Sequence, residues 1–309
     1  MTTGGMIIGR PFFKVCAALA LSVVLAGAAP GQALENLSFA KKLKLAKVGD
    51  DEAQYAVGYA YESGVDVKAD RTEAAVWYRK AAKQGHLDAM YRLARLVQEG
   101  TEGLKQSPET AFKLYEAAAQ KNHIEAQNWL GYCYQHGVGV AADNALAVQW
   151  YRKSAEAGFA TAENNLGLMY LNGKGVPRDF REAFKLFERA AGKGDGWALN
   201  NLGGLYEMGW GVAADKTRAV DYYQQARAKG IDNAKDNIAR LTAAATAPVA
   251  EAKPASPVVE PVAEPAIQVV QPVLPPPVPE VKTDGSDPAP EEQKAAAPAS
   301  GAKTDSSPD

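Results

Sequence analysis

The feature that most constrains the fold of this chain is a motif that returns every 36 or 37 residues. An alanine marks the same point in each copy, and successive marker alanines lie 36, 37, 36, 36 and 36 residues apart. These residues are Ala53, Ala89, Ala126, Ala162, Ala198 and Ala234. A fixed period of this length is typical of solenoids, in which each unit buries its apolar face by stacking on its neighbours. The sequence therefore predicts an array of repeats.

Each repeat contains two amphipathic segments, here called helix A and helix B. Counted from the marker alanine as position 0, apolar residues of helix A recur at +4, +7 and +8, which form one stripe at 100° per residue. Helix A ends at a glycine such as Gly137 or Gly173, and glycine there supplies a left-handed C-cap. Helix B opens with a side-chain oxygen, as at Asp143 and Asp179, which is typical of an N-cap. The pattern indicates an all-α fold.

Position +5, inside helix A, indicates tight packing. It is glycine in four repeats and alanine in the second: Gly58, Ala94, Gly131, Gly167 and Gly203. Glycine in a helix interior costs about 1 kcal/mol relative to alanine, so its recurrence predicts a compensating contact. We expect that contact to be the close approach of a neighbouring helix backbone.

The segment before the repeats carries a targeting pattern. Arg10 and Lys14 precede an apolar run that ends at Ala29, and its length suits a signal peptide better than a membrane span. We expect residues 1–33 to be a cleavable signal peptide, cut after Ala33 or near Ala28, which makes the protein periplasmic or secreted. An uncleaved N-terminal anchor remains the alternative. Residues 34–50 align with the second half of a repeat and predict an N-terminal capping helix.

Composition changes at the other end of the array. The repeats are expected to occupy residues 51–241, with a last half-unit as the C-terminal cap. Residues 242–309 hold 14 of the 18 prolines, among many alanines. Such a segment cannot bury a core, so we expect a disordered Pro/Ala-rich tail. Whether the tail binds a partner or only acts as a spacer stays open.

With the units aligned, a consensus emerges. It reads Ala-x-x-x-Leu-Gly-x-x-Tyr-x-x-Gly-x-Gly-Val, followed by Asp-x-x-x-Ala-x-x-Trp-Tyr-x-Lys-Ala-Ala-x-x-Gly, and is most complete in residues 126–158 and 162–194. The pattern resembles the Sel-one-like repeat, a relative of the tetratricopeptide repeat. The second unit departs from it at Ala94, at Asn122 and by one extra residue within 101–106. The resemblance implies a right-handed α/α solenoid of about five 36-residue helix-turn-helix repeats with capping helices.

Other features argue against catalysis and nucleic-acid binding. A net charge of −2, from 34 basic and 36 acidic residues, leaves no electrostatic footprint for nucleic acid. The Gly-x-Gly-Val turns follow helices, whereas a nucleotide-binding glycine motif follows a strand. Ser38 and Lys41 have the spacing of Ser-x-x-Lys hydrolases, but the partner motifs of those enzymes are missing from the sequence. His86 and His123 recur at a repeat position, and Cys133 near His136 lies on the core stripe. We therefore expect no enzyme activity, no metal, no cofactor and no nucleotide.

The candidate partner-binding residues lie at helix A positions +2 and +6, which we expect to line the concave side. Protein interfaces favour tyrosine and arginine as anchors, and asparagine can both donate to and accept from a peptide backbone. The candidates are Tyr55, Tyr59, Tyr91, Arg95, Asn128, Tyr132, Asn164 and Asn200. For the three asparagines, hydrogen bonding to neighbouring helices alone is an equal alternative.

These observations predict a non-catalytic protein–protein interaction scaffold or adaptor. The resemblance implies an exported bacterial member whose partner is an envelope or membrane protein, in a signalling or surface-assembly system. Two alternatives remain: an envelope hydrolase acting on β-lactams or cell-wall material, and binding through the proline-rich tail with the solenoid as a mount. The sequence names neither the partner nor the oligomeric state.

Overall fold

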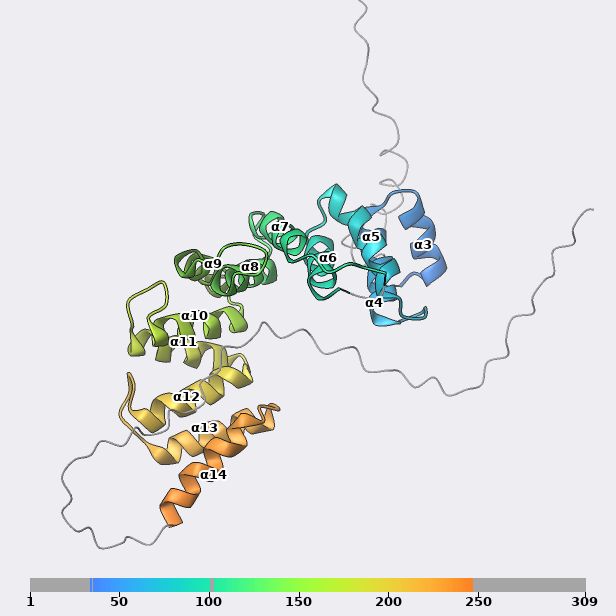
Figure 1. Ribbon diagram of the computed structural model, residues 1–309. Helices are drawn as coiled ribbons and strands as arrows, with labels where there is room; N and C mark the ends of the chain where they lie inside the picture. Colours follow the sequence, from blue (N-terminus) through green and yellow to red (C-terminus); the bar gives the residue numbers. More distant parts are fainter. Residues whose placement is uncertain (1–33, 35, 101–102, 247–309) are drawn as a thin grey trace, which may run out of the picture. The chain divides into compact units, whose positions relative to one another are not determined.

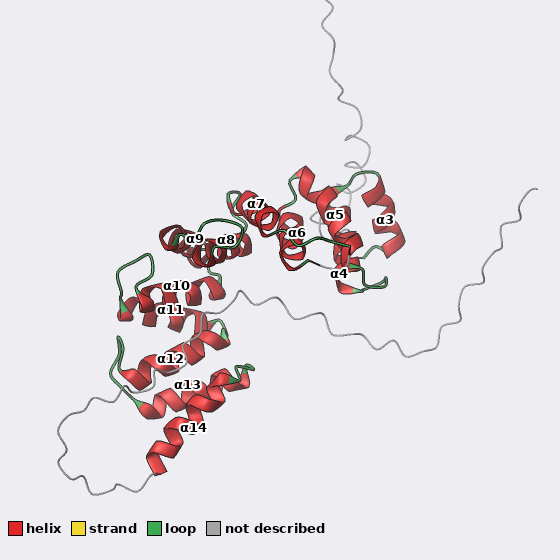
Figure 2. Ribbon diagram, viewed as in Figure 1, coloured by secondary structure: helices red, strands yellow, loops and turns green. Residues whose placement is uncertain are grey.

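The computed structural model describes residues 34, 36–100 and 103–246. Within these residues twelve α-helices follow one another and no β-strand occurs (Figures 1 and 2). The helices are α3 (Phe39–Lys47), α4 (Asp51–Ser63), α5 (Arg71–Gln84), α6 (Leu87–Glu99), α7 (Pro108–Ala119), α8 (Ile124–His136), α9 (Asn144–Glu156), α10 (Ala160–Asn172), α11 (Phe180–Gly192), α12 (Gly196–Met208), α13 (Lys216–Ala228) and α14 (Asn233–Thr246). The predicted signal peptide and most of the predicted tail lie outside the described residues.

The helices pack in chain order, each against the helix before it and the helix after it (Figure 1). The even-numbered helices from α4 to α12 are the predicted A helices, and the odd-numbered helices from α5 to α13 are the B helices. Helices α3 and α14 flank the five pairs, which confirms the predicted solenoid with its capping helices. Helix α14 runs to Thr246, so helical structure extends past Leu241, where the sequence predicted the tail to begin. No helix in the described part of the chain is long and apolar enough to span a membrane.

The marker alanines and the glycines that end helix A adopt the roles that the sequence predicted. All six marker alanines are completely buried, because a larger side chain there would separate helix A from its neighbours. Gly64, Gly137, Gly173 and Gly209 adopt the left-handed conformation at the end of helix A. Asn122, which replaces the closing glycine in the second repeat, also has a positive φ of 66°. Asparagine tolerates this region better than most residues, so the replacement preserves the turn.

The contact that explains the glycine at +5 is an aromatic ring, which corrects the expectation of a helix backbone. A Cβ atom added to Gly58 or Gly131 would lie 2.7 Å from the ring of Tyr78 or Tyr151, on helix B of the same repeat. Phe187 and Tyr223 occupy the same place against Gly167 and Gly203. These four rings are completely buried. The helix-propensity cost of glycine is thus offset by packing a large ring directly on the backbone of helix A.

Close backbone approach does occur, at the second glycine of the loop after helix A. A Cβ atom on Gly175 would lie 2.2 Å from the carbonyl oxygen of Asn144, in the preceding repeat. Gly139 and Gly211 stand in the same relation to the carbonyl oxygens of Pro108 and Phe180. The Gly-x-Gly turn is therefore a docking point between repeats.

Candidate functional site

Three of the eight candidate contact residues do not reach the surface. Asn128 and Asn164 are completely buried and Asn200 is 1% exposed. A helix A in the middle of the array has neighbours on several sides, and these positions lie against the next repeat. The prediction that these asparagines contact a partner is corrected, because a partner cannot reach them.

Their side chains instead join successive repeats. The Nδ2 group of Asn165 donates to Oδ1 of Asn128 at 3.1 Å. One repeat further on, Asn201 donates to Asn164 at 2.9 Å. The pattern continues into the C-terminal cap, where Asn237 donates to Asn200 at 3.3 Å. Position +3 of each of these repeats therefore bonds to position +2 of the repeat before it, which is the structural alternative considered for the asparagines.

The first repeats use other residue types at the same two positions. Arg92, at +3 of the second repeat, donates from Nε to the hydroxyl of Tyr55 at 3.1 Å. The guanidinium of Arg92 also donates to Glu62 at 3.1 Å and lies 4.7 Å from the ring centre of Tyr59. Tyrosine and arginine are longer than asparagine. The contact between the first and second repeats therefore extends to the surface of the protein.

A second hydrogen-bonding pattern links the two helices of a repeat. The hydroxyl of Tyr78 donates to Glu62 at 2.6 Å, and that of Tyr151 donates to Gln135 at 2.8 Å. Tyr223 and Glu207 form the same pair in the fifth repeat. The fourth repeat has Phe187 with Leu171 at the equivalent positions. The sequence reasoning missed this pairing, although the joint loss of donor and acceptor in one repeat was a signal for it.

The accessible candidates form a tyrosine row, defined here as Tyr55, Tyr59, Tyr91 and Tyr132 on α4, α6 and α8. Tyr59 is 38% exposed and the other three are partly exposed. The pKa values of Tyr55, Tyr91 and Tyr132 are raised by burial, so these hydroxyls remain neutral near pH 7. The row therefore presents apolar ring faces together with neutral hydroxyl groups.

Two histidines hold the row in place. His86 stacks on Tyr55 with ring centres 4.6 Å apart, and His123 stacks on Tyr91 at 5.1 Å. The Nδ1 atoms of these histidines accept from the backbone N–H groups of Ala89 and Ala126, so each caps helix A of its repeat. Their recurrence thus has a structural cause, as the sequence indicated.

Arg95, the eighth candidate, is on α6 next to the row. Its guanidinium lies 5.9 Å from the ring centre of Tyr91, but the residue is only 7% exposed.

Cys133, a possible metal ligand by its spacing from His136, is buried, and burial raises the pKa of its thiol to about 12. The described residues contain no group of three His, Cys, Asp or Glu side chains placed to hold a metal ion.

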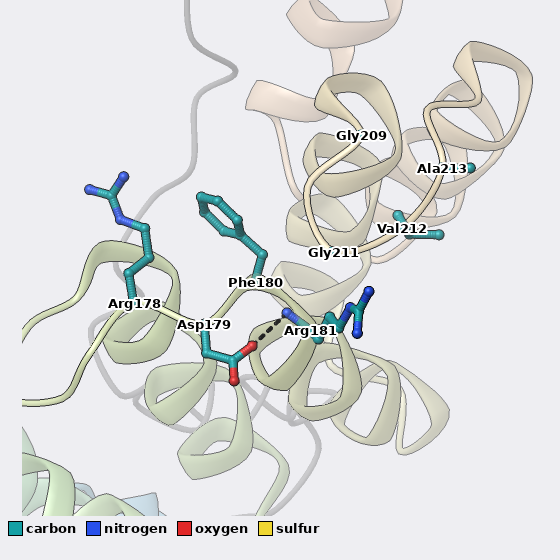
Figure 3. A pocket seen from close by; sticks show the side chains of 8 residues that line it. All are labelled: Arg178, Asp179, Phe180, Arg181, Gly209, Gly211, Val212 and Ala213. Carbon is teal, nitrogen blue, oxygen red and sulfur yellow. Dashed lines mark hydrogen bonds between the residues drawn. The ribbon is translucent and has the colours of Figure 1, made fainter.

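A shallow hollow lies at the junction of the fourth and fifth repeats (Figure 3). It is bordered by the start of α11, with Arg178, Phe180 and Arg181, and by the loop that follows α12. Asp179, which also lines the hollow, accepts from the backbone N–H of Arg181 as the N-cap of α11. Phe180 stacks on Trp210 with ring centres 5.2 Å apart. The carboxylate and the rings are thus engaged in helix capping and repeat packing.

Comparison with known proteins places these features in a family. The model of the Sel1 repeat matches residues 51–86, 87–123, 124–159, 160–195 and 198–231. A solved protective antigen of uropathogenic Escherichia coli, which displays an SLR fold, is 33% identical with a TM-score of 0.62. The alignment covers 67% of this chain and 44% of that one. A Sel1 repeat protein from Oxalobacter formigenes is also 33% identical, with a TM-score of 0.58 and coverage of 66% and 59%.

A curated relative extends the similarity to eukaryotes. The chain is 33% identical over 110 residues to a chitin synthase regulator of Saccharomyces cerevisiae, which covers 35% of this chain and 15% of that protein. The chain therefore spans only a small part of the curated relative and about half of the two solved structures. Sel1 repeat proteins are typically scaffolds or adaptors for protein interactions.

Proposed function

Since this chain belongs to the Sel1 repeat family, we propose that it is a non-catalytic scaffold that binds a protein or peptide through the tyrosine row of its first three repeats. The observation that carries the proposal is the exposure of Tyr59 beside three further partly exposed tyrosines on successive A helices. The corresponding +6 positions of the fourth and fifth repeats are Leu168, 2% exposed, and a buried glycine, Gly204. The row is therefore confined to one part of the array.

The chemistry of the row suits recognition of an extended ligand. Tyrosine offers large contact area at low conformational-entropy cost, and its hydroxyl can bond to a ligand backbone. The ring of Tyr59 is held by the guanidinium of Arg92, which is itself fixed by Glu62. A surface held in one arrangement before binding loses less entropy when the ligand arrives. Binding would use shape and hydrogen bonding without a chemical step.

We further propose that the protein acts in the bacterial envelope, with an envelope or membrane protein as its partner. The targeting pattern of residues 1–33 supports export, and the described array has no membrane-spanning helix. One relative is described as a protective antigen of a bacterium, and another as a regulator of chitin synthase. Both descriptions concern those proteins. They favour a scaffold that acts at a cell boundary and regulates another protein.

The test compares how much partner protein the unmodified full chain and a doubly substituted chain capture from envelope extract. The substituted chain carries Tyr59→Ala and Tyr132→Ala together. We expect the substituted chain to lose specific partners by at least tenfold in mass-spectrometric intensity while its helicity is unchanged. Tyr170→Ala, on α10 and outside the row, is the matched control because it also removes a partly exposed tyrosine from an A helix. Equal capture by all three chains would contradict the proposal.

The two alternatives have separate tests. Deleting residues 247–309 leaves every described helix in place, so loss of capture on deletion would move binding to the tail. Turnover of a chromogenic β-lactam that persists through repurification would establish a hydrolase. We expect neither result if the tyrosine row is the binding surface.

A further inference from the structure

Arg95 is a buried cation for which the described residues provide no counter-ion. It is the only lysine or arginine in the described part of the chain that is buried, at 7% exposure. Its Nε atom has no hydrogen-bond partner there, and the described groups with which its guanidinium interacts are the tyrosines Tyr91 and Tyr115, not a carboxylate. A buried charge is costly unless it is paired and hydrogen-bonded, so this arrangement requires a reason.

Two partly exposed arginines show which group is missing. Arg92 pairs with Glu62 at 3.1 Å, and Arg240 pairs with Glu207. The two acidic residues that share α6 with Arg95 are engaged elsewhere. Glu99 pairs with Arg71, and Asp88 lies 3.2 Å from Nε2 of His123. The second repeat thus presents a guanidinium without the carboxylate that its counterparts have.

Two further polar groups of the second repeat lack a hydrogen-bond partner among the described residues. They are the hydroxyl of Tyr115 and Oε1 of Gln98, and both are buried. The equivalent groups bond to each other in the first, third and fifth repeats. Gln98 follows Arg95 by three residues on α6, so both side chains project from the same side of the helix. The second repeat is also the one with Ala94 at position +5 and with the longer loop.

We propose that Arg95 anchors a carboxylate-binding site, which takes an aspartate or glutamate side chain of an extended peptide ligand. This inference rests on the proposed function, because the peptide would lie along the tyrosine row and reach Arg95 beside Tyr91. A guanidinium binds a carboxylate through two parallel hydrogen bonds. A single cation matches a single negative charge, whereas a phosphate carries nearly two. The backbone N–H of the ligand can donate to Gln98 once that side chain turns outward.

The site is tested with random 12-residue peptides that have amidated C-termini, selected for binding to the full chain. Amidation excludes the terminal carboxylate, so enriched peptides should share an aspartate or glutamate side chain. Changing that residue to its amide should weaken binding to the unmodified chain at least tenfold. On the Arg95→Gln chain, the acidic peptide and its amide should bind equally.

Stability and a control variant separate binding from folding. Since Arg95 makes no ion pair in the described structure, Arg95→Gln should not lower the Tm in the absence of peptide. Arg152→Gln, which changes an exposed arginine on α9, should leave the tenfold difference between the two peptides intact. If Arg95→Gln does not fold, the peptide pair on the unmodified chain decides the question alone.

Enriched peptides without a shared acidic residue, or equal binding of the acidic peptide and its amide, would overturn the carboxylate site while leaving the proposed function in place. If the enriched peptides bind the chain with Tyr59→Ala and Tyr132→Ala as tightly as the unmodified chain, the tyrosine row is not the binding surface. A selection that enriches no peptide would count against both.

Discussion

The ring of Phe187 lies where a side chain on Gly167 would begin, since a Cβ atom at Gly167 would be 2.6 Å from Cε1 of Phe187. In an isolated helix, alanine would be favoured over glycine by about 1 kcal/mol. In this array the ring occupies the space of the methyl group, so packing reverses that preference. Only in the second repeat does an alanine, Ala94, stand opposite the equivalent ring of Tyr115.

Gly167→Leu should therefore destabilise the array. Inserting a branched side chain against a buried ring forces the helices apart, and overpacking of this kind costs typically about 1–3 kcal/mol. The measurement is the urea midpoint and the Tm of the full chain. Gly192→Ala is the control, because a Cβ atom there meets nothing within 4 Å. We expect this control to be neutral or slightly stabilising, and an unchanged Tm for Gly167→Leu would contradict the ring contact.

The period, the caps and the marker alanines could be predicted from sequence because each is decided locally or by one dominant neighbour. A glycine after helix A needs only its own backbone conformation to be recognised. A completely buried alanine such as Ala162 recurs at a fixed spacing because every repeat packs in the same way. The group that packs against a glycine inside a helix cannot be recognised from the repeat pattern in this way. Gly167 could face a backbone or a ring, and its sequence position is the same in both cases.

The candidate site was only partly predictable for a related reason. A helical stripe identifies one buried face and predicts that the opposite face is open to solvent. In α10, however, Asn164 and Leu168 on that face are both at most 2% exposed, because the next repeat covers them. Residue size separates the two cases. Tyrosine at +2 or +6 keeps part of its ring exposed, whereas asparagine and leucine at the same positions are enclosed.

In three repeats a tyrosine of helix B bonds to the residue at position +9 of helix A, nine residues after the marker alanine. This pairing predicts how the fourth repeat responds to substitution. Phe187→Tyr alone would place a hydroxyl beside Leu171, and both residues are at most 3% exposed. A buried hydroxyl without a partner costs about 1–3 kcal/mol. Adding Leu171→Gln should recover most of this loss by restoring the arrangement of Tyr151 with Gln135. A double-mutant cycle in urea measures the coupling. Additive effects would show that the pair does not form.

The asparagine contacts predict a loss of stability rather than of binding. Asn201→Ala removes the donor to Asn164 Oδ1 between two buried side chains. Leaving that acceptor unpaired should lower the free energy of unfolding by about 1–3 kcal/mol. Asn172→Ala, at an exposed position near the end of α10, should cost much less. Partner capture by folded Asn201→Ala should equal that of the unmodified chain. Lost capture at an unchanged Tm would show that the junction of Asn201 with Asn164 takes part in binding.

Cys133 gives the array a distinct response to alkaline pH. Burial raises the pKa of its thiol to about 12, against 9.0 ordinarily. The unfolded chain therefore releases this proton at a lower pH than the folded chain. The contribution to stability is complete below pH 9 and declines as pH rises from 9 toward 12, by at most about 1.4 kcal/mol per pH unit.

Since buried tyrosines titrate in the same range, the informative quantity is a difference. In a Cys16→Ser background, the urea midpoint of the chain with Cys133 should fall more steeply between pH 9 and 11 than that of Cys133→Ala. The native thiol should also resist a thiol-reactive dye at pH 8 and react at once in denaturant, because the thiolate is the reactive form. Parallel pH profiles together with rapid labelling of the folded chain would show that Cys133 is accessible, and would contradict its place in the core.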